Sequence, residues 1–199
     1  IHALGVAGAV ETLTSLIASL SDDERLQTVA FDALGDSGDR GIEALKTLIL
    51  QPSSPPRVQA EAIEVVSRAR ALAAIQALTP RLLELIQTAS DESVRFNAAR
   101  ALGKADEFED LERLVRTSSD PVVQDVAIWS LGRQAVRRWK AAARQALERL
   151  APRMTELVQH SSDPTLLSDT IRALRKTDAL EALRTLRPRL AELAQMPDV

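Results

Sequence analysis

Apolar residues recur along this chain with the spacing of a helix face, in segments that resemble one another. The clearest segment, residues 91–103, opens with Asp91 and closes with Gly103. Its apolar face consists of Val94, Ala98, Ala101 and Leu102. Asp91 is suited to cap a helix, because its carboxylate accepts a hydrogen bond from an unpaired backbone N–H. The pattern predicts an amphipathic helix that ends where Gly103 adopts the left-handed conformation.

Five copies of this pattern predict five similar helices, which we call the second helices. They span residues 23–35, 55–67, 91–103, 120–132 and 163–175. The expected capping residues are Asp23, Ser54, Asp91, Asp120 and Asp163. In the first copy Leu26 takes the position of Val94, so we expect Leu26 to be buried.

A first helix is expected before each second helix, so that the two form an antiparallel pair. The predicted first helices span residues 9–20, 41–50, 71–89, 107–117 and 136–160, and a sixth covers 180–195. The connecting loops are short, about two to five residues. Each pair is too small to bury its apolar face alone, so neighbouring pairs must stack. The predicted fold is therefore an all-α, right-handed α-solenoid of stacked antiparallel helix pairs.

One stretch of ten residues returns twice. Leu78–Gln87 reappears as Leu150–Gln159, 72 residues later, and as Leu186–Gln195, 36 residues after that. A period near 36 is typical of a repeat array. Pro80 and Pro152 lie inside the first two copies, where proline cannot donate an N–H and clashes with the preceding turn. We expect each of these first helices to bend or to restart at its proline.

The repeat covers the whole sequence, so residues 1–199 are expected to form a single array of about five helix pairs plus a partial terminal unit. The chain begins with Ile1 rather than methionine, and Ile1, Leu4 and Val6 are poor polar caps for the end of a solenoid. We therefore expect this sequence to be a segment of a longer protein.

Composition narrows the classes of function. Apolar residues make up 45% of the chain and aromatic residues 3%, which suits tightly packed helices. Residues 1–99 carry 8 basic and 13 acidic side chains and residues 100–199 carry 17 and 15, far from the balance of a strongly basic nucleic-acid binder. The absence of cysteine excludes disulfides and fits a cytoplasmic location. No apolar stretch reaches the roughly 18 residues that a membrane span requires.

The motif at residues 91–95, followed by residues 98–103, resembles the HEAT-repeat superfamily, especially bacterial units of the phycobilisome-lyase type. It reads Asp-Glu-Ser-Val-Arg and then Ala-Ala-Arg-Ala-Leu-Gly. Pro80, Pro152 and Pro188 also look like that family. The resemblance implies a superhelix whose concave surface is lined by the second helices, and a role as a protein–protein interaction scaffold.

The residues that face outward from the second helices form the candidate binding site. At the register of Arg100 the five copies carry Asp32, Glu64, Arg100, Trp129 and Arg172. The register of Lys104 adds Asp36, Arg133 and Lys176, and Phe96 lies on the same face. The face is expected to be negative toward the N-terminus and positive toward the C-terminus, which would orient a charged partner. We expect that partner to be a protein, a peptide or another domain of the same parent chain.

Trp129 is the sharpest single candidate, because large exposed aromatic residues are enriched at binding hot spots. The alternative is that Trp129 packs against Phe96 or Val126 on neighbouring helices, and the same alternative holds for Phe96. Trp139, in a first helix, is expected to pack at a junction between helices.

A second candidate site is the basic cluster in residues 133–153. It contains Arg133, Arg137, Arg138, Lys140, Arg144, Arg149 and Arg153, with Glu148 as its one acid. Such a cluster is suited to follow a phosphate backbone, as in some HEAT-like DNA-repair glycosylases, so nucleic-acid binding is the alternative function. The simpler interpretation is an exposed helix kept soluble by arginine, because these positions spread around the helix rather than forming one stripe.

The sequence shows no catalytic constellation. The acidic runs at residues 22–24 and 106–110 lie at helix starts, where acids complement the helix dipole. The two histidines, His2 and His160, are not spaced as a metal-ligand pair. We therefore expect a non-enzymatic chain without a cofactor or metal site. Modification of a bilin cofactor is suggested by the family resemblance alone, and no residue of this sequence supports it.

Overall fold

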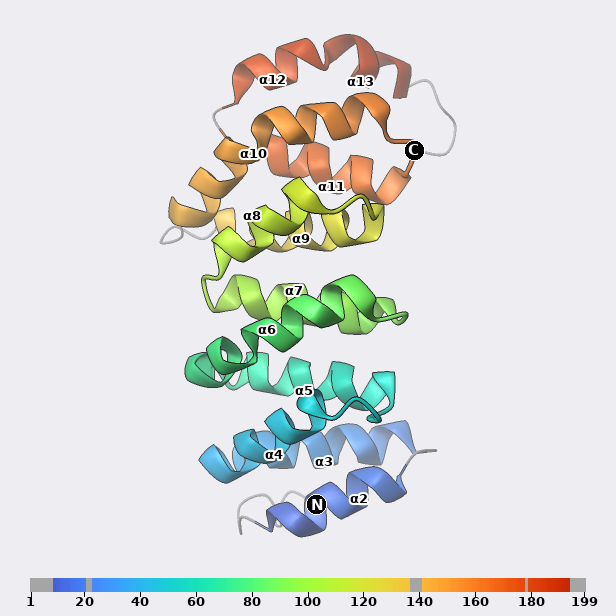
Figure 1. Cartoon of the computed structure of the whole chain (residues 1–199), viewed down its shortest axis with the longest axis vertical. Coiled ribbons are helices and arrows are strands. Elements are labelled where there is room, and N and C mark those ends of the chain that lie inside the picture. Colours follow the sequence, from blue (N-terminus) through green and yellow to red (C-terminus); the bar gives the residue numbers. More distant parts are fainter. Residues whose placement is uncertain (1–8, 21–22, 137–140, 178, 194–199) are drawn as a thin grey trace. The chain divides into compact units, whose positions relative to one another are not determined.

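The computed structural model describes residues 9–20, 23–136, 141–177 and 179–193, which form twelve α-helices and no strands. Figure 1 labels the helices α2 Val10–Ser19, α3 Glu24–Asp36, α4 Gly38–Leu50, α5 Pro56–Arg68, α6 Leu72–Thr88, α7 Glu92–Lys104, α8 Phe108–Thr117, α9 Pro121–Ala135, α10 Ala141–His160, α11 Pro164–Leu174, α12 Leu180–Thr185 and α13 Arg187–Leu193. The prediction of an all-α fold is confirmed.

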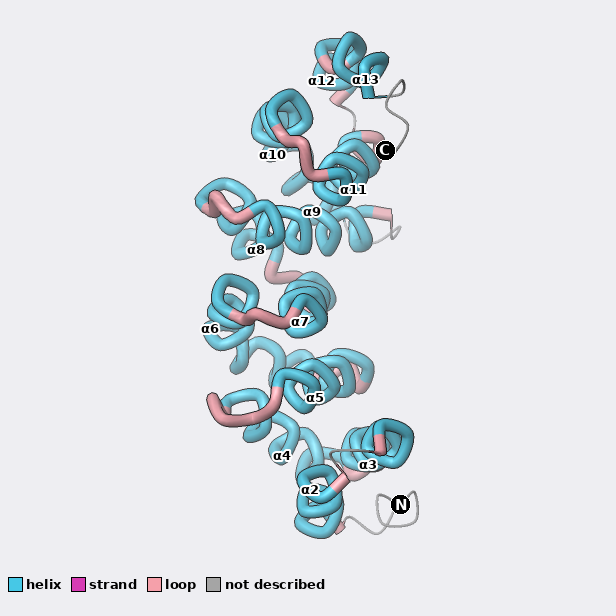
Figure 2. Tube along the Cα trace, turned by 90° about the vertical axis from the view of Figure 1, so that its right-hand side faces the viewer, coloured by secondary structure: helices cyan, strands magenta, loops and turns pink. Residues whose placement is uncertain are grey.

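Successive helices pack in pairs, and backbone contacts divide the chain into unit 1, Ile1–Ala105, and unit 2, Asp106–Val199. In unit 1 the first helices α2, α4 and α6 form one layer and the second helices α3, α5 and α7 form another (Figure 2). In unit 2 the second helix α9 packs against α8, α10 and α11. This is the pairwise arrangement of an α-solenoid, as predicted. The right-handed superhelix and its concave surface stay predictions.

The core follows the apolar faces predicted for the second helices. In α7 the four predicted core residues are at most 1% exposed. The corresponding closing residues Leu34, Val66, Leu131 and Leu174 are buried as well. Leu26 is the exception, because it is 43% exposed and its predicted burial is wrong. The physical reason is its position in α3: α5 and α7 each pack on the second helix before them, whereas no second helix precedes α3 in the described residues.

Four of the five predicted caps are confirmed. Asp23, Asp91, Asp120 and Asp163 each accept a hydrogen bond from a backbone N–H of the first helical turn, at 2.9–3.1 Å. The prediction for Ser54 is wrong, since Pro55 occupies the cap position of α5 and makes no capping bond. Here Pro56 starts the helix, because the fixed φ of proline already suits a first helical residue.

The predicted helix end at Gly103 is also wrong. Gly103 is a buried residue inside α7, and the helix continues to Lys104. The left-handed residue comes later, at Asp106, with φ 67°. The chain reverses direction only after the backbone N–H of Ala105 has bonded to the carbonyls of the last turn.

The prolines of the repeated stretch have different effects. Pro80 lies inside the continuous helix α6 and Pro152 inside α10, so neither helix restarts there. In Figure 1 α10 changes direction along its length, which fits the predicted bend. The third copy breaks instead: α12 ends at Thr185 and α13 begins at Arg187, directly before Pro188.

Most other helix boundaries lie within a few residues of their predictions. The largest difference concerns the helix predicted for residues 136–160, which begins at Ala141. Val136 belongs to the end of α9, where it is the C-cap residue. Helix α4 starts at Gly38, three residues before the predicted start, because only Ser37 separates it from α3.

The turn between α3 and α4 depends on two glycines. Gly38 has φ 67°, a left-handed conformation that glycine adopts without steric cost. Gly41 lies so close to α3 that a Cβ atom there would overlap the carbonyl oxygen of Leu34. The sharp reversal of the chain therefore requires a residue without a side chain at position 41.

We predict that Gly41→Ala lowers the free energy of unfolding by about 1–3 kcal/mol, because overpacking against backbone forces α4 away from α3. Denaturation in urea, followed by circular dichroism, measures the change. The matched control is Gly132→Ala in α9, where the nearest atoms to a new Cβ lie at 3.6 and 3.8 Å. That variant is expected to gain up to about 1 kcal/mol from helix propensity. Equal midpoints for the two variants would contradict the packing argument.

Candidate functional site

Polar side chains connect successive second helices in unit 1. Asn97 Nδ2 of α7 donates to the carbonyl oxygen of Ala60 in α5 at 3.0 Å. Lys104 Nζ, also in α7, donates to the carbonyl oxygen of Ser67 at 3.2 Å. A carbonyl oxygen has two lone pairs, so these bonds join the helices without displacing a helical hydrogen bond. Lys104, a predicted binding residue, is thus half-buried and engaged within the fold.

Ion pairs cross the same face of unit 1. Arg68 of α5 pairs with Asp32 of α3, and Arg100 of α7 pairs with Glu64 of α5. Arg68 also lies 3.9 Å from Glu64, so the four side chains form a row of alternating charge. Three of the four were predicted as site residues. The structure brings them together as partners of one another, which neutralises part of the charge that the sequence assigned to this face.

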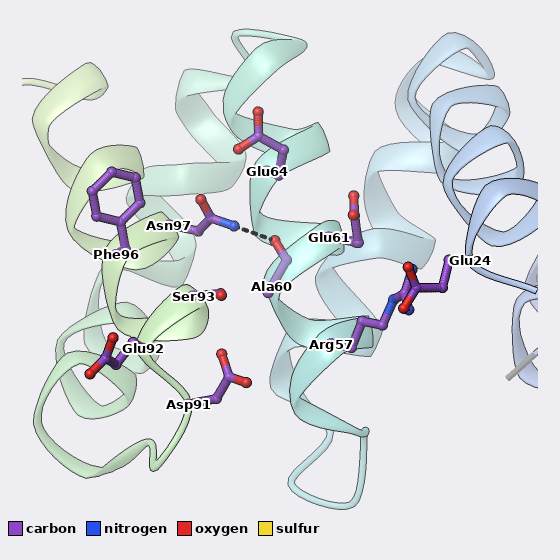
Figure 3. A pocket seen from close by; sticks show the side chains of 10 residues that line it. All are labelled: Glu24, Arg57, Ala60, Glu61, Glu64, Asp91, Glu92, Ser93, Phe96 and Asn97. Carbon is purple, nitrogen blue, oxygen red and sulfur yellow. Dashed lines mark hydrogen bonds and ion pairs between the residues drawn. The ribbon is translucent and has the colours of Figure 1, made fainter. Parts of the chain in front are cut away.

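An open groove of about 800 Å³ lies on the second-helix side of unit 1, between α3, α5 and α7 (Figure 3). It is lined by Glu24, Arg57, Ala60, Glu61, Glu64, Asp91, Glu92, Ser93, Phe96 and Asn97. Five of these residues carry a carboxylate, whereas Arg57 carries the single guanidinium and pairs with Glu24. Phe96 is half-buried, so its ring is neither fully enclosed nor fully exposed. We call this the acidic groove.

A smaller pocket of about 480 Å³ lies farther along α3 and α5. It is lined by Asp32, Gly35, Asp36, Val65, Arg68 and Ala69. A Cβ atom at Gly35 would lie 2.7 Å from Cγ1 of Val65, so the glycine allows α3 to approach α5 closely. Two predicted site residues, Asp32 and Asp36, line this pocket.

In unit 2 the predicted residues form an aromatic and basic surface. Trp129 of α9 is half-buried, and the guanidinium carbon of Arg133 lies 5.4 Å from the centroid of its ring, within the range of a cation–π interaction. Arg172 of α11 is exposed. Lys176 is half-buried and donates to the carbonyl oxygen of Gly132 at 3.0 Å. Burial, with a further contribution from nearby Arg172, lowers the pKa of Lys176 below its ordinary value.

Asp125 of α9 is an acid in an unfavourable environment. It lies in the register of Phe96, and its Oδ1 atom is buried without a hydrogen-bond partner. Burial, followed by the nearby carboxylates of Asp169 and Asp163, raises the pKa of Asp125 to about 7. Asp125 therefore carries a proton over part of the pH range in which an ordinary aspartate is charged.

The basic cluster is only partly described by the structure. Arg137, Arg138, Lys140 and Trp139 lie outside the described residues, whereas Arg144 is exposed on α10. Arg149 pairs with Glu112 of α8 at 2.7 Å, and Arg153 pairs with Glu156 at 2.9 Å.

Glu112 accepts hydrogen bonds from both Arg149 and Arg116. Burial alone would raise the pKa of Glu112, but these two arginines outweigh it and hold that pKa below its ordinary value. The pairs show that Arg149 serves the contact between two first helices, α8 and α10, rather than a free basic surface.

The sequence analysis missed some of the residues that face outward from the second helices. Arg68 lies in the register of Lys104 and places a base in the half of the face expected to be acidic. Glu61 lies in the register of Asn97 and lines the acidic groove, as does Glu92. The sequence analysis compared the copies at only two outward registers, those of Arg100 and Lys104. A comparison of all five copies at every outward register would have found these residues.

The helix pairs match a known repeat family. Residues 42–132 match the family model described as HEAT repeats, and this range spans the second helices α5 and α7 and nearly all of α9. This part of the chain is similar to HEAT repeats. The predicted resemblance to HEAT repeats is thereby confirmed at the level of the family.

Two solved structures are similar to nearly the whole chain. Both are crystal structures of engineered proteins from the Northeast Structural Genomics Consortium. One is 25% identical, with 96% of this chain and 90% of that chain covered and a TM-score of 0.52. The other is 23% identical, with 94% and 92% covered and a TM-score of 0.56. A comparison with curated proteins found no match.

The described residues contain no group of three or more His, Cys, Asp or Glu side chains arranged to hold a metal ion. Among the same residues, every helix is too short or too polar to cross a membrane.

We predict that Asp125→Asn stabilises the protein at pH 8 by about 1–2 kcal/mol, a figure reduced for the partial exposure of the carboxyl group. The folded-state pKa is raised, so the native state of Asp125 holds its proton more tightly than the unfolded state. Stability from this group is therefore present below about pH 4 and is lost as the pH rises to about 7. The advantage of the variant should be nearly gone at pH 4, where the aspartate is protonated in the native state and about half protonated in the unfolded state.

Urea unfolding at pH 4, 6 and 8 measures this difference. Asp39→Asn, in the exposed first turn of α4, is the control for the loss of one negative charge. A gain of the same size at all three pH values would contradict the assignment to Asp125.

Proposed function

We propose that this chain is a non-catalytic protein–protein interaction module that holds a peptide or a folded domain against the outward face of its second helices. The observation that carries the proposal is the open groove of about 800 Å³ on that side of unit 1. The apolar faces of the same helices are buried within the stack, so the groove side is the one left for a partner. HEAT repeats generally act as scaffolds for protein interaction, which supports the same function.

The proposed contact surface has two chemically different parts. In unit 1 it comprises the acidic groove with Phe96. In unit 2 it comprises Trp129, Arg133 and Arg172, where an indole and two guanidinium groups lie on neighbouring second helices α9 and α11. Tryptophan and arginine are the side chains most often found at binding hot spots, because they bury large areas and also form directed polar contacts.

Finer features remain part of this proposal. They are a single HEAT-like array over residues 1–199, units of the phycobilisome-lyase type, and a bacterial, cytoplasmic protein. The capping motif at residues 91–103 supports the repeat type, the ratio of 21 arginines to 4 lysines supports a bacterial origin, and the lack of cysteine supports the compartment.

Binding of a nucleic-acid backbone has less support. In the described part of the basic cluster, Arg149 and Arg153 already pair with acids, whereas the exposed Arg144 forms no ion pair with another described residue. A salt titration separates the two functions, since phosphate binding weakens steeply with ionic strength.

The test uses random twelve-residue peptides displayed on phage and selected on the whole chain. We expect Trp129→Ala/Arg172→Glu to weaken at least some of the selected peptides about tenfold or more, because a hot-spot side chain and a charge are lost from the second helices. Fluorescence anisotropy with the synthetic peptides measures the change, and circular dichroism checks that the variant folds. Arg172→Glu alone provides a second variant that leaves the partly buried indole in place.

The matched control is Arg113→Glu/Gln145→Ala, which reverses one charge and truncates one side chain on the first helices α8 and α10. The proposal fails if every selected peptide responds to the control as strongly as to the second-helix variant.

A further inference from the structure

We propose that the acidic groove of unit 1 is a docking site for an extended peptide segment that carries lysine or arginine side chains. This inference rests on the proposed function and names the chemistry of the partner. It depends on three features of the groove: its shape, the state of its carboxylates and its aromatic wall.

The floor of the groove is suited to a main chain. Ala60 of α5 and Ser93 of α7 are small residues, so a peptide backbone can approach the two helices closely. Asn97 points toward α5 in Figure 3 and is fixed there by its bond to the Ala60 carbonyl. A residue held in place in this way presents its amide oxygen without further loss of side-chain entropy on binding.

The carboxylates of the groove are not all used by the fold. Glu24 pairs with Arg57, Glu64 pairs with Arg100, and Asp91 caps the N-terminus of α7. Glu61 of α5 and Glu92 of α7 line the groove and are engaged in no ion pair within the described residues. They belong to two different second helices, so they place uncompensated negative charge on both sides of the floor.

This arrangement favours a cationic occupant. The groove holds five carboxylates against one guanidinium, so an acidic segment would be repelled and a basic one attracted. Phe96 adds a half-buried ring on the α7 side, and a lysine or arginine side chain of the partner can lie over such a ring while its charge reaches a carboxylate. A segment with basic side chains at two consecutive positions reaches both sides of the floor, because an extended chain directs successive side chains to opposite sides.

The test compares three fluorescein-labelled ten-residue peptides in which consecutive pairs of lysine, glutamine or glutamate residues are separated by pairs of alanine residues. We expect the lysine peptide to bind the whole chain and the glutamate peptide not to bind. We expect Glu61→Gln/Glu92→Gln to weaken the lysine peptide about tenfold, since two charge contacts are lost. Fluorescence anisotropy at low and high salt measures the affinities, and circular dichroism checks the fold.

The matched control is Glu43→Gln/Glu84→Gln, which removes the same charge from the first helices α4 and α6. Its affinity for the lysine peptide should change less than twofold. An equal loss in both double variants, equal binding of the lysine and glutamine peptides, or no binding of the lysine peptide overturns the proposal. If the lysine peptide fails while phage-selected peptides still bind the second helices, the partner class is wrong and the proposed function survives.

Discussion

Within each unit, the stacking of a second helix on the one before it is the contact on which the rest of the structure depends. Single helix pairs have too little apolar surface to fold alone, so their stability comes from neighbours. In α7 the side that faces α5 joins a buried apolar face to polar bonds from Asn97 and Lys104. Burial supplies most of the free energy, and the polar bonds fix the register, because each donor meets one particular carbonyl.

The same stacking explains why charges read from the sequence are not free charges. A register that repeats every 36 residues places Asp32 beside Arg68 and Glu64 beside Arg100. Ion pairs that are partly exposed contribute little to stability, but they remove net charge from the surface. A charged residue stays available to a partner when the equivalent residue of the next repeat does not carry the opposite charge. Glu61 is such a residue, because its equivalent is the neutral Asn97.

Sequence periodicity was sufficient for the helix pairs, the four aspartate caps and the core face of each second helix, because these depend on local patterns. It failed at Gly103, which is a buried residue inside α7 rather than the residue that ends the helix. It failed at Leu26 because burial there requires a preceding second helix. The acidic groove was not predictable as a cavity, since its volume depends on how far α3, α5 and α7 stand apart, and no single register encodes that separation.

The two units use different polar groups to join neighbouring second helices, so the outward surfaces of their second helices differ in chemistry. The register of Asn97 carries Asp169 in α11, and an ionised carboxylate cannot donate to a neighbouring carbonyl as an amide does. Asp169 instead pairs with Arg172 in its own helix, while Lys176 supplies the bond to α9. Burial raises the pKa of Asp125, and the exchange of amide for acid adds to this shift, because it places Asp169 near Asp125. Unit 2 therefore contains a carboxyl group with a raised pKa, whereas in the acidic groove of unit 1 Glu61 and Glu92 remain for a cationic ligand.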